Sequence, residues 1–157
     1  MYSGYDLMGL LGKSQADALI VKLLADLGNT KGIKKPKRGE TDSYLEAPEK
    51  GIELLFQLAE ALPERIGDQF QEGELVLHTI FFRPPADPDA AIYNSLPKGL
   101  QSKTSRQDAR ALLGKPDWIS RVETADRWMI DGLKIHIRFN KNEESIDMLT
   151  LSLADDE

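Results

Sequence analysis

The sequence predicts an α+β protein whose helices pack on one side of an antiparallel sheet. Two segments, 14–27 and 105–113, carry apolar residues at helical spacing and are each followed by a glycine. After each comes a pair of strand-like segments joined by a tight turn, and then one more strand-like segment. Because helix, hairpin and strand occur twice in this order, we expect two related α-β-β-β units.

These two units are expected to form a single compact domain over residues 1–157. We place the first unit at 1–84, the second at 96–157 and a linker at 85–95, which is rich in proline and turn-forming residues. With 41% hydrophobic and 29% charged residues, the chain has the composition of a globular protein that buries a core. Divergence after an internal duplication would produce this pattern, and so would a chance recurrence of common caps and turns.

The first helix is expected to begin at Ser14, because Ser14 and Asp17 have the spacing of an N-terminal cap. Gly28 stands where a left-handed residue often ends a helix. The residues expected on the buried side of this helix are Ala16, Leu19, Ile20, Leu23, Leu24 and Leu27.

The rest of the first unit reads as a hairpin and a strand. The sequence Pro-Glu-Lys-Gly at 48–51 predicts the hairpin turn, and 74–83 is rich in residues that suit a pleated sheet. Between them, an insertion at 58–73 is expected to hold a short helix through Leu58, Ala61 and Leu62.

The second helix repeats the signature of the first. Ser105 and Asp108 have the capping spacing, and Gly114 followed by Pro116 predicts the end of the helix. Its expected apolar stripe is Ala109, Leu112 and Leu113. Trp118 follows, and we expect it to wedge between helix and sheet, the alternative being an exposed contact residue.

The second hairpin is the most sharply predicted element, because Asp131-Gly132 is a dipeptide favoured in type I′ turns. A two-residue turn at this point pairs Arg127 with His136 and Met129 with Lys134, and paired residues share a face. One face is then apolar, with Trp128, Ile130, Leu133, Ile135, Ile137 and Phe139. In the last strand, Leu149, Leu151 and Leu153 are expected on this apolar face, and Ile146, Met148, Thr150 and Ser152 on the opposite one.

The polar face of this hairpin is the candidate binding site. We call six residues on it the cationic strip: Arg127, Met129, Lys134, His136, Arg138 and Met148. Arginine and methionine are enriched in protein interfaces, and aspartate and glutamate are absent from the strip. The alternative is an ordinary solvated sheet face whose cations pair with acidic residues elsewhere in the fold.

The sequence offers little for catalysis or for a metal. It has no cysteine and only two histidines, so we predict no catalytic residues, no metal site and no cofactor. An enzyme with a site around His136 and a carboxylate remains an alternative. The formal net charge of −6 disfavours nucleic acid as a partner, although the basic segment around Lys34, Lys35 and Lys37 leaves a contact to phosphate open.

No segment of the sequence resembles a secretory signal or a membrane-spanning helix. The first residues include Asp6 within their apolar run and have no basic leader, and no later apolar run approaches the roughly 20 residues that span a bilayer. We therefore expect a cytoplasmic protein with no membrane partner.

Residues 96–117, with 126–139 and 146–153, resemble a recurring bacterial module in which a short capped helix ending in Leu-Gly-x-Pro precedes a three-stranded meander. The tandem form is similar to the fold of the β-lactamase inhibitor protein, and the single unit is similar to lipoprotein modules of the SmpA/OmlA type. Small bacterial immunity proteins contain similar sequences. The resemblance implies a protein-binding scaffold without chemistry, but the disulfides of the inhibitor and the lipidation cysteine of the lipoproteins are missing here.

These observations lead to one functional hypothesis and two alternatives. We expect a non-enzymatic module that binds another protein, for example an immunity protein that neutralises a toxin. The first alternative is the enzyme around His136. The second is a self-association module, in which the cationic strip forms a homodimer.

Overall fold

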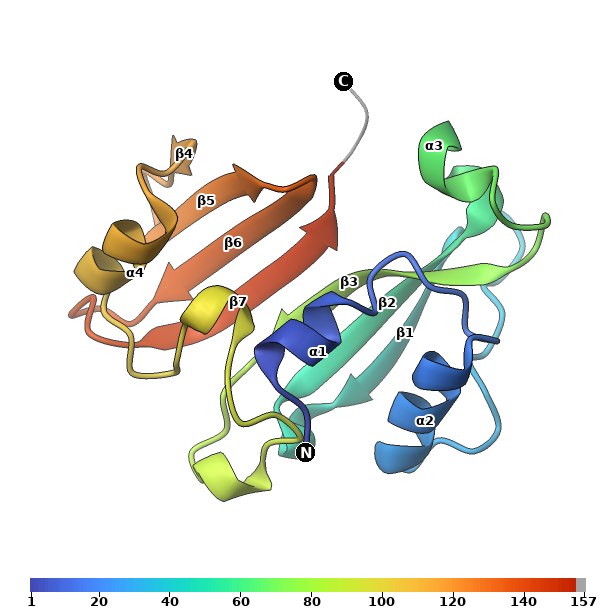
Figure 1. Ribbon diagram of the computed structural model, residues 1–157, viewed down its shortest axis with the longest axis horizontal. Coiled ribbons are helices and arrows are strands. Elements are labelled where there is room, and N and C mark those ends of the chain that lie inside the picture. Colours follow the sequence, from blue (N-terminus) through green and yellow to red (C-terminus); the bar gives the residue numbers. More distant parts are fainter. Residues whose placement is uncertain (155–157) are drawn as a thin grey trace.

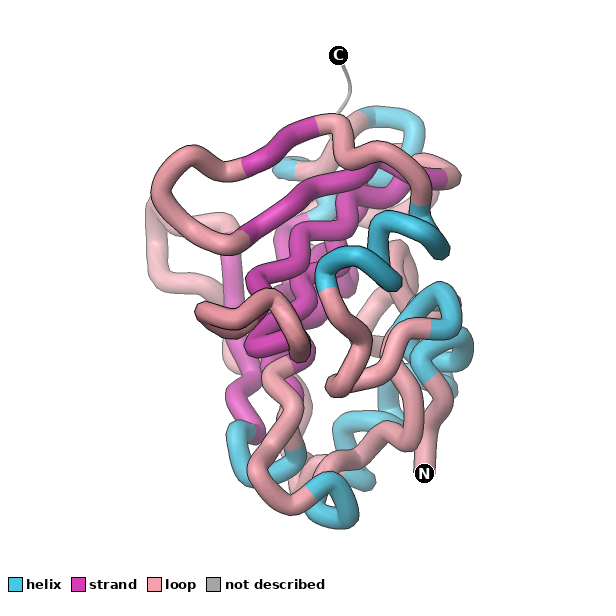
Figure 2. The backbone as a smooth tube through the Cα atoms, turned by 90° about the vertical axis from the view of Figure 1, so that its left-hand side faces the viewer, coloured by secondary structure: helices cyan, strands magenta, loops and turns pink. Residues whose placement is uncertain are grey.

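The computed structural model describes residues 1–154, and its centre is one seven-stranded antiparallel sheet. The strand order is β1-β2-β3-β7-β6-β5-β4. Three helices lie in front of the sheet in Figure 1: α1 (Gly4–Met8), α2 (Ala18–Asp26) and α4 (Arg106–Leu113). In Figure 2, most helical turns lie on one side of the strands. The predicted α+β class with an antiparallel sheet is confirmed, and the fourth helix, α3 (Glu64–Gly67), lies at one end of the sheet.

The strands of the two halves of the chain meet in the middle of this sheet. The first half contributes β1 (Asp42–Ala47), β2 (Ile52–Leu58) and β3 (Leu75–Phe82), and the second contributes β4 (Trp118–Ile119), β5 (Ala125–Ile130), β6 (Leu133–Phe139) and β7 (Ile146–Leu153). Residues 79–82 of β3 pair with residues 149–152 of β7. In the second half, the short strand β4 stands between α4 and the hairpin, a strand that the sequence did not predict. The two related units and their origin by duplication stay predictions.

The start of the chain completes the sheet where β3 and β7 diverge. The amides of Gly12 and Gln15 donate to the carbonyls of Leu77 and Leu75, at 2.8 Å each. Ser14 therefore lies in an extended segment, and its predicted role as the helix cap is wrong. Asp17 caps α2 instead, because its carboxylate accepts from the amide of Leu19 at 2.9 Å.

The end of α2 follows the prediction. Gly28 has a left-handed φ of 84°, which a residue with a side chain would adopt only with strain. Its amide donates to the carbonyl of Ala25, and the amide of Asn29 donates to the carbonyl of Leu24. These two hydrogen bonds form the Schellman motif that ends a helix.

The α4 helix begins and ends as predicted but presents a different face to the sheet. The Ser105 hydroxyl accepts from the amide of Asp108 at 3.0 Å, and Gly114 follows the last turn. Ala109 is fully buried, whereas Leu112 is 57% exposed, so its expected place in the apolar stripe is wrong. Leu112 points outward because the inner face of the helix also carries two arginines, described below.

The insertion at 58–73 also differs from the prediction. Strand β2 continues through Leu58, a 3₁₀ turn follows at Ala59–Ala61, and the helix α3 spans Glu64–Gly67. The expected helix through Leu58, Ala61 and Leu62 is therefore wrong. Ile66 of α3 packs in a small buried cluster with Val76 and Leu153 at one end of the sheet.

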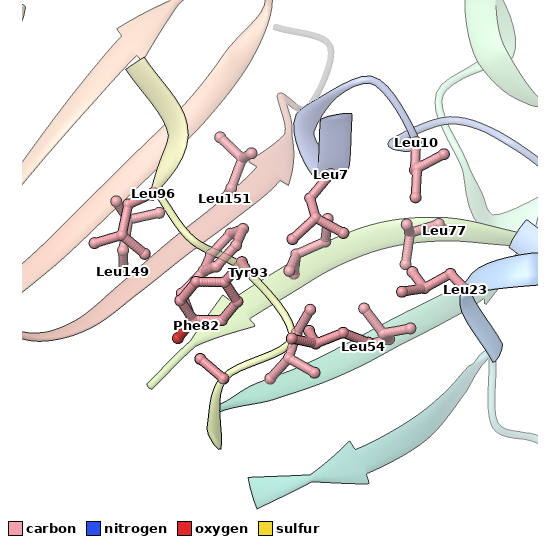
Figure 3. Close-up of a cluster of buried hydrophobic side chains, with 14 of the residues drawn as sticks. Leu7, Leu10, Leu23, Leu54, Leu77, Phe82, Tyr93, Leu96, Leu149 and Leu151 are labelled. Atoms are coloured by element: carbon pink, nitrogen blue, oxygen red, sulfur yellow. The ribbon is translucent and has the colours of Figure 1, made fainter. Parts of the chain in front are cut away.

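One hydrophobic core lies between the sheet and the helices. Figure 3 shows part of this core, with Leu7 and Leu10 from the start of the chain, Leu77 of β3, Leu96, and Leu149 and Leu151 of β7. The expected linker takes part in this core. The ring of Tyr93 packs edge-on against Phe82, with 5.2 Å between centroids, and its hydroxyl donates to the carbonyl of Gly51 at 2.9 Å. Burial raises the pKa of Tyr93 well above its ordinary value.

Candidate functional site

The second hairpin has the register that its sequence predicts. Asp131 and Gly132 form the turn with φ values of 54° and 78°, as a type I′ turn requires. Arg127 pairs with His136, and Met129 pairs with Lys134. The apolar residues predicted on the opposite face are buried or pack against the core: Trp128, Ile130, Leu133, Ile135, Ile137 and Phe139.

The last strand confirms one predicted strip residue and corrects another assignment. Met148 pairs with Arg138, as expected for a residue on the same face. Ile146, predicted beside it, is only 4% exposed and pairs with Phe139 on the core side. The cause is an irregularity in the pairing between Arg138 and Phe139, which leaves one extra residue in β7 and reverses the direction of Ile146.

All six residues of the cationic strip lie together on the sheet face opposite α1, α2 and α4. We call this the open face. Met129 is 48% exposed, and the other five are half-buried. The structure thus brings together every residue that the sequence assigned to the strip.

The open face extends beyond the strip across all seven strands, but Thr79 and Ser152 near its middle are buried. Residues paired from strand to strand form one continuous line with a member on every strand. We call this line the central row: Trp118, Arg127, His136, Thr150, Phe81, Glu53 and Glu46. A parallel line, the second row, consists of Met129, Lys134, Ser152, Thr79, Leu55 and Tyr44. The sequence missed the members from the first half of the chain because it does not reveal which strands join the two halves.

Trp118 lies at one end of the central row and not between helix and sheet, so the expected wedge is wrong. It is 42% exposed, on the edge strand β4. The guanidinium carbon of Arg127 lies 4.6 Å from the centroid of the indole ring, and the His136 ring lies 5.8 Å away between centroids. A cation over an aromatic face is attracted to the ring electrons, so Trp118 holds Arg127 against the sheet.

The cationic end of the row is short of negative charge. The Nε of Arg127 is buried, and no hydrogen-bond partner for it exists among residues 1–154. Burial lowers the pKa of His136, the charges of Arg127 and Arg138 lower it further, and Glu123 opposes this only in part. The imidazole is therefore neutral at pH 7, where it can accept as well as donate hydrogen bonds.

The opposite end of the row is acidic. Glu46 and Glu53 are directly opposite each other on β1 and β2, an arrangement that is unfavourable for like charges. Burial raises the pKa of Glu53, and the neighbouring Glu46 raises it further, while Arg83 acts in the other direction. The row therefore carries opposite charge at its two ends.

A buried ion cluster holds α4 against β5, beside the cationic end of the row. Asp126 is completely buried, and its carboxylate accepts two hydrogen bonds each from Arg106 and Arg110, at 2.7 to 3.2 Å. Burial alone would raise the pKa of Asp126, but the hydrogen bonds from Arg110 and Arg106 hold it below its ordinary value. Arg106 also donates to Glu143 at 2.6 Å. The cluster fixes the strand that carries Arg127.

The two histidines and the basic segment were the other candidates for a site. In the part of the chain that the structure describes, no carboxylate forms a hydrogen bond with His136, and no three histidine or acidic side chains are grouped to hold a metal ion. His78 lies on β3, with its Nδ1 2.6 Å from the hydroxyl of Thr79. In the basic segment, Lys34, Lys35 and Lys37 are exposed in the connection between α2 and β1.

None of the helices within residues 1–154 is both long enough and apolar enough to cross a bilayer.

Comparison with protein-family models finds no match to the chain, and comparisons with curated proteins and with solved structures find no similar protein either. The resemblance to the inhibitor-like and SmpA/OmlA-like modules therefore stays a prediction.

Proposed function

We propose that this protein is a non-enzymatic module that binds another protein through the open face of its sheet. The observation that carries this proposal is the central row, in which aromatic, cationic and hydroxyl side chains on five strands are followed by two carboxylates on β2 and β1, all of them at least partly exposed. Protein interfaces are enriched in aromatic residues, methionine and arginine. Trp118, Met129 and Tyr44, all more than two-fifths exposed, lie on this face.

The rigidity of the face supports the same function. Its side chains stand on paired strands, and the other side of those strands is packed against the hydrophobic core. Trp118 restricts Arg127, so less side-chain freedom is lost when a partner binds. A rigid surface of this kind is suited to binding another protein, because its side chains are already positioned before the partner arrives.

The overall charge suggests a class of partner. The formal net charge of −6 would speed the encounter with a basic protein, because complementary long-range fields raise association rates. An immunity protein that neutralises a basic toxin by direct binding fits this charge, and the sequence resemblance points the same way. In this proposal the acidity steers the encounter, and the open face provides the contact.

The test is affinity capture from a lysate of the native source with a variant that reverses the cationic strip. The variant carries R127E, K134E and R138E. A matched control carries K35E, K37E and R38E in the exposed connection before β1, with the same change in net charge. Both are first shown to be folded by circular dichroism and urea unfolding.

A protein retained by the wild type and by the control, but lost from the strip variant, is the expected result. A protein retained equally by all three would place the docking site away from the open face. A protein lost from both variants would show that net charge, and not this face, determines binding.

A further inference from the structure

We infer that the open face also binds a second copy of this chain, in a twofold dimer that covers the surface a partner would use. This inference rests on the proposed function, because it takes the open face to be a docking surface. In this inference, a second copy of the chain covers the open face when no partner protein is bound. Four properties of the central row lead to it: the symmetry of its charges, the charge left uncompensated at each end, its geometry and its size.

The charges of the row are arranged symmetrically about its middle. Thr150 on β7 is the central member of the seven, Arg127 lies two strands away on one side, and Glu53 lies two strands away on the other. With about 4.8 Å between neighbouring strands, the backbone positions of Arg127 and Glu53 each lie roughly 10 Å from that of Thr150. A cationic and an anionic residue are therefore attached at equal distances from one point of the sheet.

Neither charge is fully compensated by the residues that the structure describes. At the cationic end, the buried Nε of Arg127 has no hydrogen-bond partner among residues 1–154, and Arg138 adds a like charge nearby. Among residues 1–154, the carboxylates that oppose these charges at His136 are Glu123 and the buried Asp126, and Asp126 is already bound by two other arginines. The cationic end would therefore gain from an added carboxylate.

The acidic end of the row would gain from an added cation. Glu53 faces Glu46 across the strands, and within residues 1–154 Arg83 is the cation that lowers the pKa of Glu53. In this described part of the chain, two carboxylates with one nearby guanidinium leave an excess of negative charge. A second guanidinium placed over Glu53 would relieve the repulsion between Glu46 and Glu53.

A single symmetry operation satisfies both ends at once. If two open faces meet around a twofold axis that runs along the strands through Thr150, the second copy is reversed across the row. Arg127 of each copy then lies over Glu53 of the other, and His136 lies over Phe81. In the second row, Met129 lies over Leu55. Because the operation is twofold, each of these contacts occurs twice.

The strands of the two sheets run in the same general direction in this arrangement. Twisted sheets that pack face to face keep their strands within about 30° of each other, so the geometry is an ordinary one. Six of the strands have at least five residues and together are about 24 Å wide, five residues of each give a length of about 17 Å, and the two residues of β4 extend one edge by about 5 Å. The face thus offers roughly 440 Å² per copy, or about 900 Å² in total, which is at the low end of the range for weak protein interfaces.

This size predicts a weak dimer that exchanges with the monomer. A partner that binds the open face competes directly with the second copy, so self-association lowers the concentration of free binding sites. In the dimer the open faces are covered, and dilution or a tightly binding partner would shift the equilibrium toward monomers with free faces.

The experiment is sedimentation velocity of the full chain from about 5 to about 500 μM, a range suited to an interface of this size. Four proteins are compared: the wild type, R127E, E53R and the double variant R127E/E53R. K35E serves as the control for a charge change outside the face. Each variant is first checked for folding by urea unfolding.

The expected result has three parts. The wild type and K35E approach the mass of a dimer at the top of the range. R127E and E53R each weaken dimerisation by about tenfold or more, because each places like charges over one another at two symmetric contacts. The double variant restores the charge pairing in reverse and regains dimerisation to within about threefold of the wild type.

Three outcomes would overturn the inference: a wild type that stays monomeric throughout, a dimer that neither single variant weakens, or a double variant weaker than both single variants. The capture experiment separates these failures from a failure of the proposed function. A monomeric wild type whose captured protein is still lost from the strip variant overturns self-association alone. A captured protein retained by the strip variant overturns the open face as the partner site.

Discussion

The carboxylate of Asp126, which is completely buried, accepts two hydrogen bonds from the guanidinium of Arg110, at 2.8 and 2.9 Å. Arg106 binds the same carboxylate through two further donors. A buried carboxylate with this many charged donors stays ionised and links helix α4 to strand β5. Since β5 carries Arg127 and Met129, the cluster supports the proposed docking face from behind.

Removing the charge of Asp126 should therefore destabilise the fold. We expect D126N to lower the free energy of unfolding by about 3 kcal/mol, because it leaves two arginines without their shared anion. Urea unfolding followed by circular dichroism measures this loss. D147N removes the same charge at an exposed position of β7 and should change the free energy by less than about 0.5 kcal/mol. Equal effects of the two variants would show that the cluster contributes nothing specific.

The same cluster predicts how stability depends on acid. The pKa of Asp126 is lower in the folded protein than its ordinary value of 3.8, so the unfolded chain binds the proton more readily. Its contribution to stability is complete above about pH 3.8 and is lost as the pH falls through the folded pKa. The difference in unfolding free energy between wild type and D126N should therefore shrink below this pH. A difference that grows in acid would contradict the cluster.

His136 provides a direct probe of charge on the open face. Its pKa should lie below the ordinary 6.5 when measured by NMR titration of the ring protons, because it is half-buried and close to Arg127 and Arg138. R138Q should raise this pKa, and E123Q should lower it further. The unfolded chain binds more protons than the folded one just below pH 6.5, so the free energy of unfolding should fall as the pH drops through this range. A rise in the pKa of His136 in E123Q would contradict the assigned surroundings.

Gly4 determines whether α1 can pack against the second half of the chain. A Cβ atom at Gly4 would lie 2.1 Å from the carbonyl carbon of Leu96, too close for any side chain. We expect G4A to lower the free energy of unfolding by about 2 kcal/mol or more, because the backbone has to move apart. G9A is the matched control, since a Cβ atom at Gly9 would meet nothing closer than 3.5 Å. If G4A is as stable as G9A, α1 does not pack as closely against Leu96 as described.

The sequence predicts those parts of the fold that depend on local chemistry. The Asp131-Gly132 turn determines the register of β5 and β6, so every pairing predicted for the hairpin is present. Ser105 and Gly114 delimit α4 for the same reason, since caps and turns act within a few residues. The expectation for Ile146 fails because it assumes an uninterrupted strand pairing, and an irregularity beside Phe139 is not visible in a hydrophobic pattern.

Features that depend on contacts distant in sequence could not be predicted in this way. Ser14 pairs with Val76, 62 positions along the chain, and this long-range pairing overrides a local capping signal. The acidic end of the central row is likewise invisible until β3 is placed beside β7. The cluster around Asp126 did leave a signal, because Arg106 and Arg110 are four residues apart on the face of α4 that also carries the buried Ala109.

The most direct test of the open face as a docking surface is hydroxyl-radical footprinting of the protein alone and bound to its captured partner. Trp118 and Met129 report on the open face, and Tyr5, which is 77% exposed on α1, reports on the helical side. We predict that the partner protects Trp118 and Met129 from oxidation and leaves Tyr5 unchanged. Protection of Tyr5 with continued oxidation of Trp118 and Met129 would place the partner on the helices and contradict the proposed function.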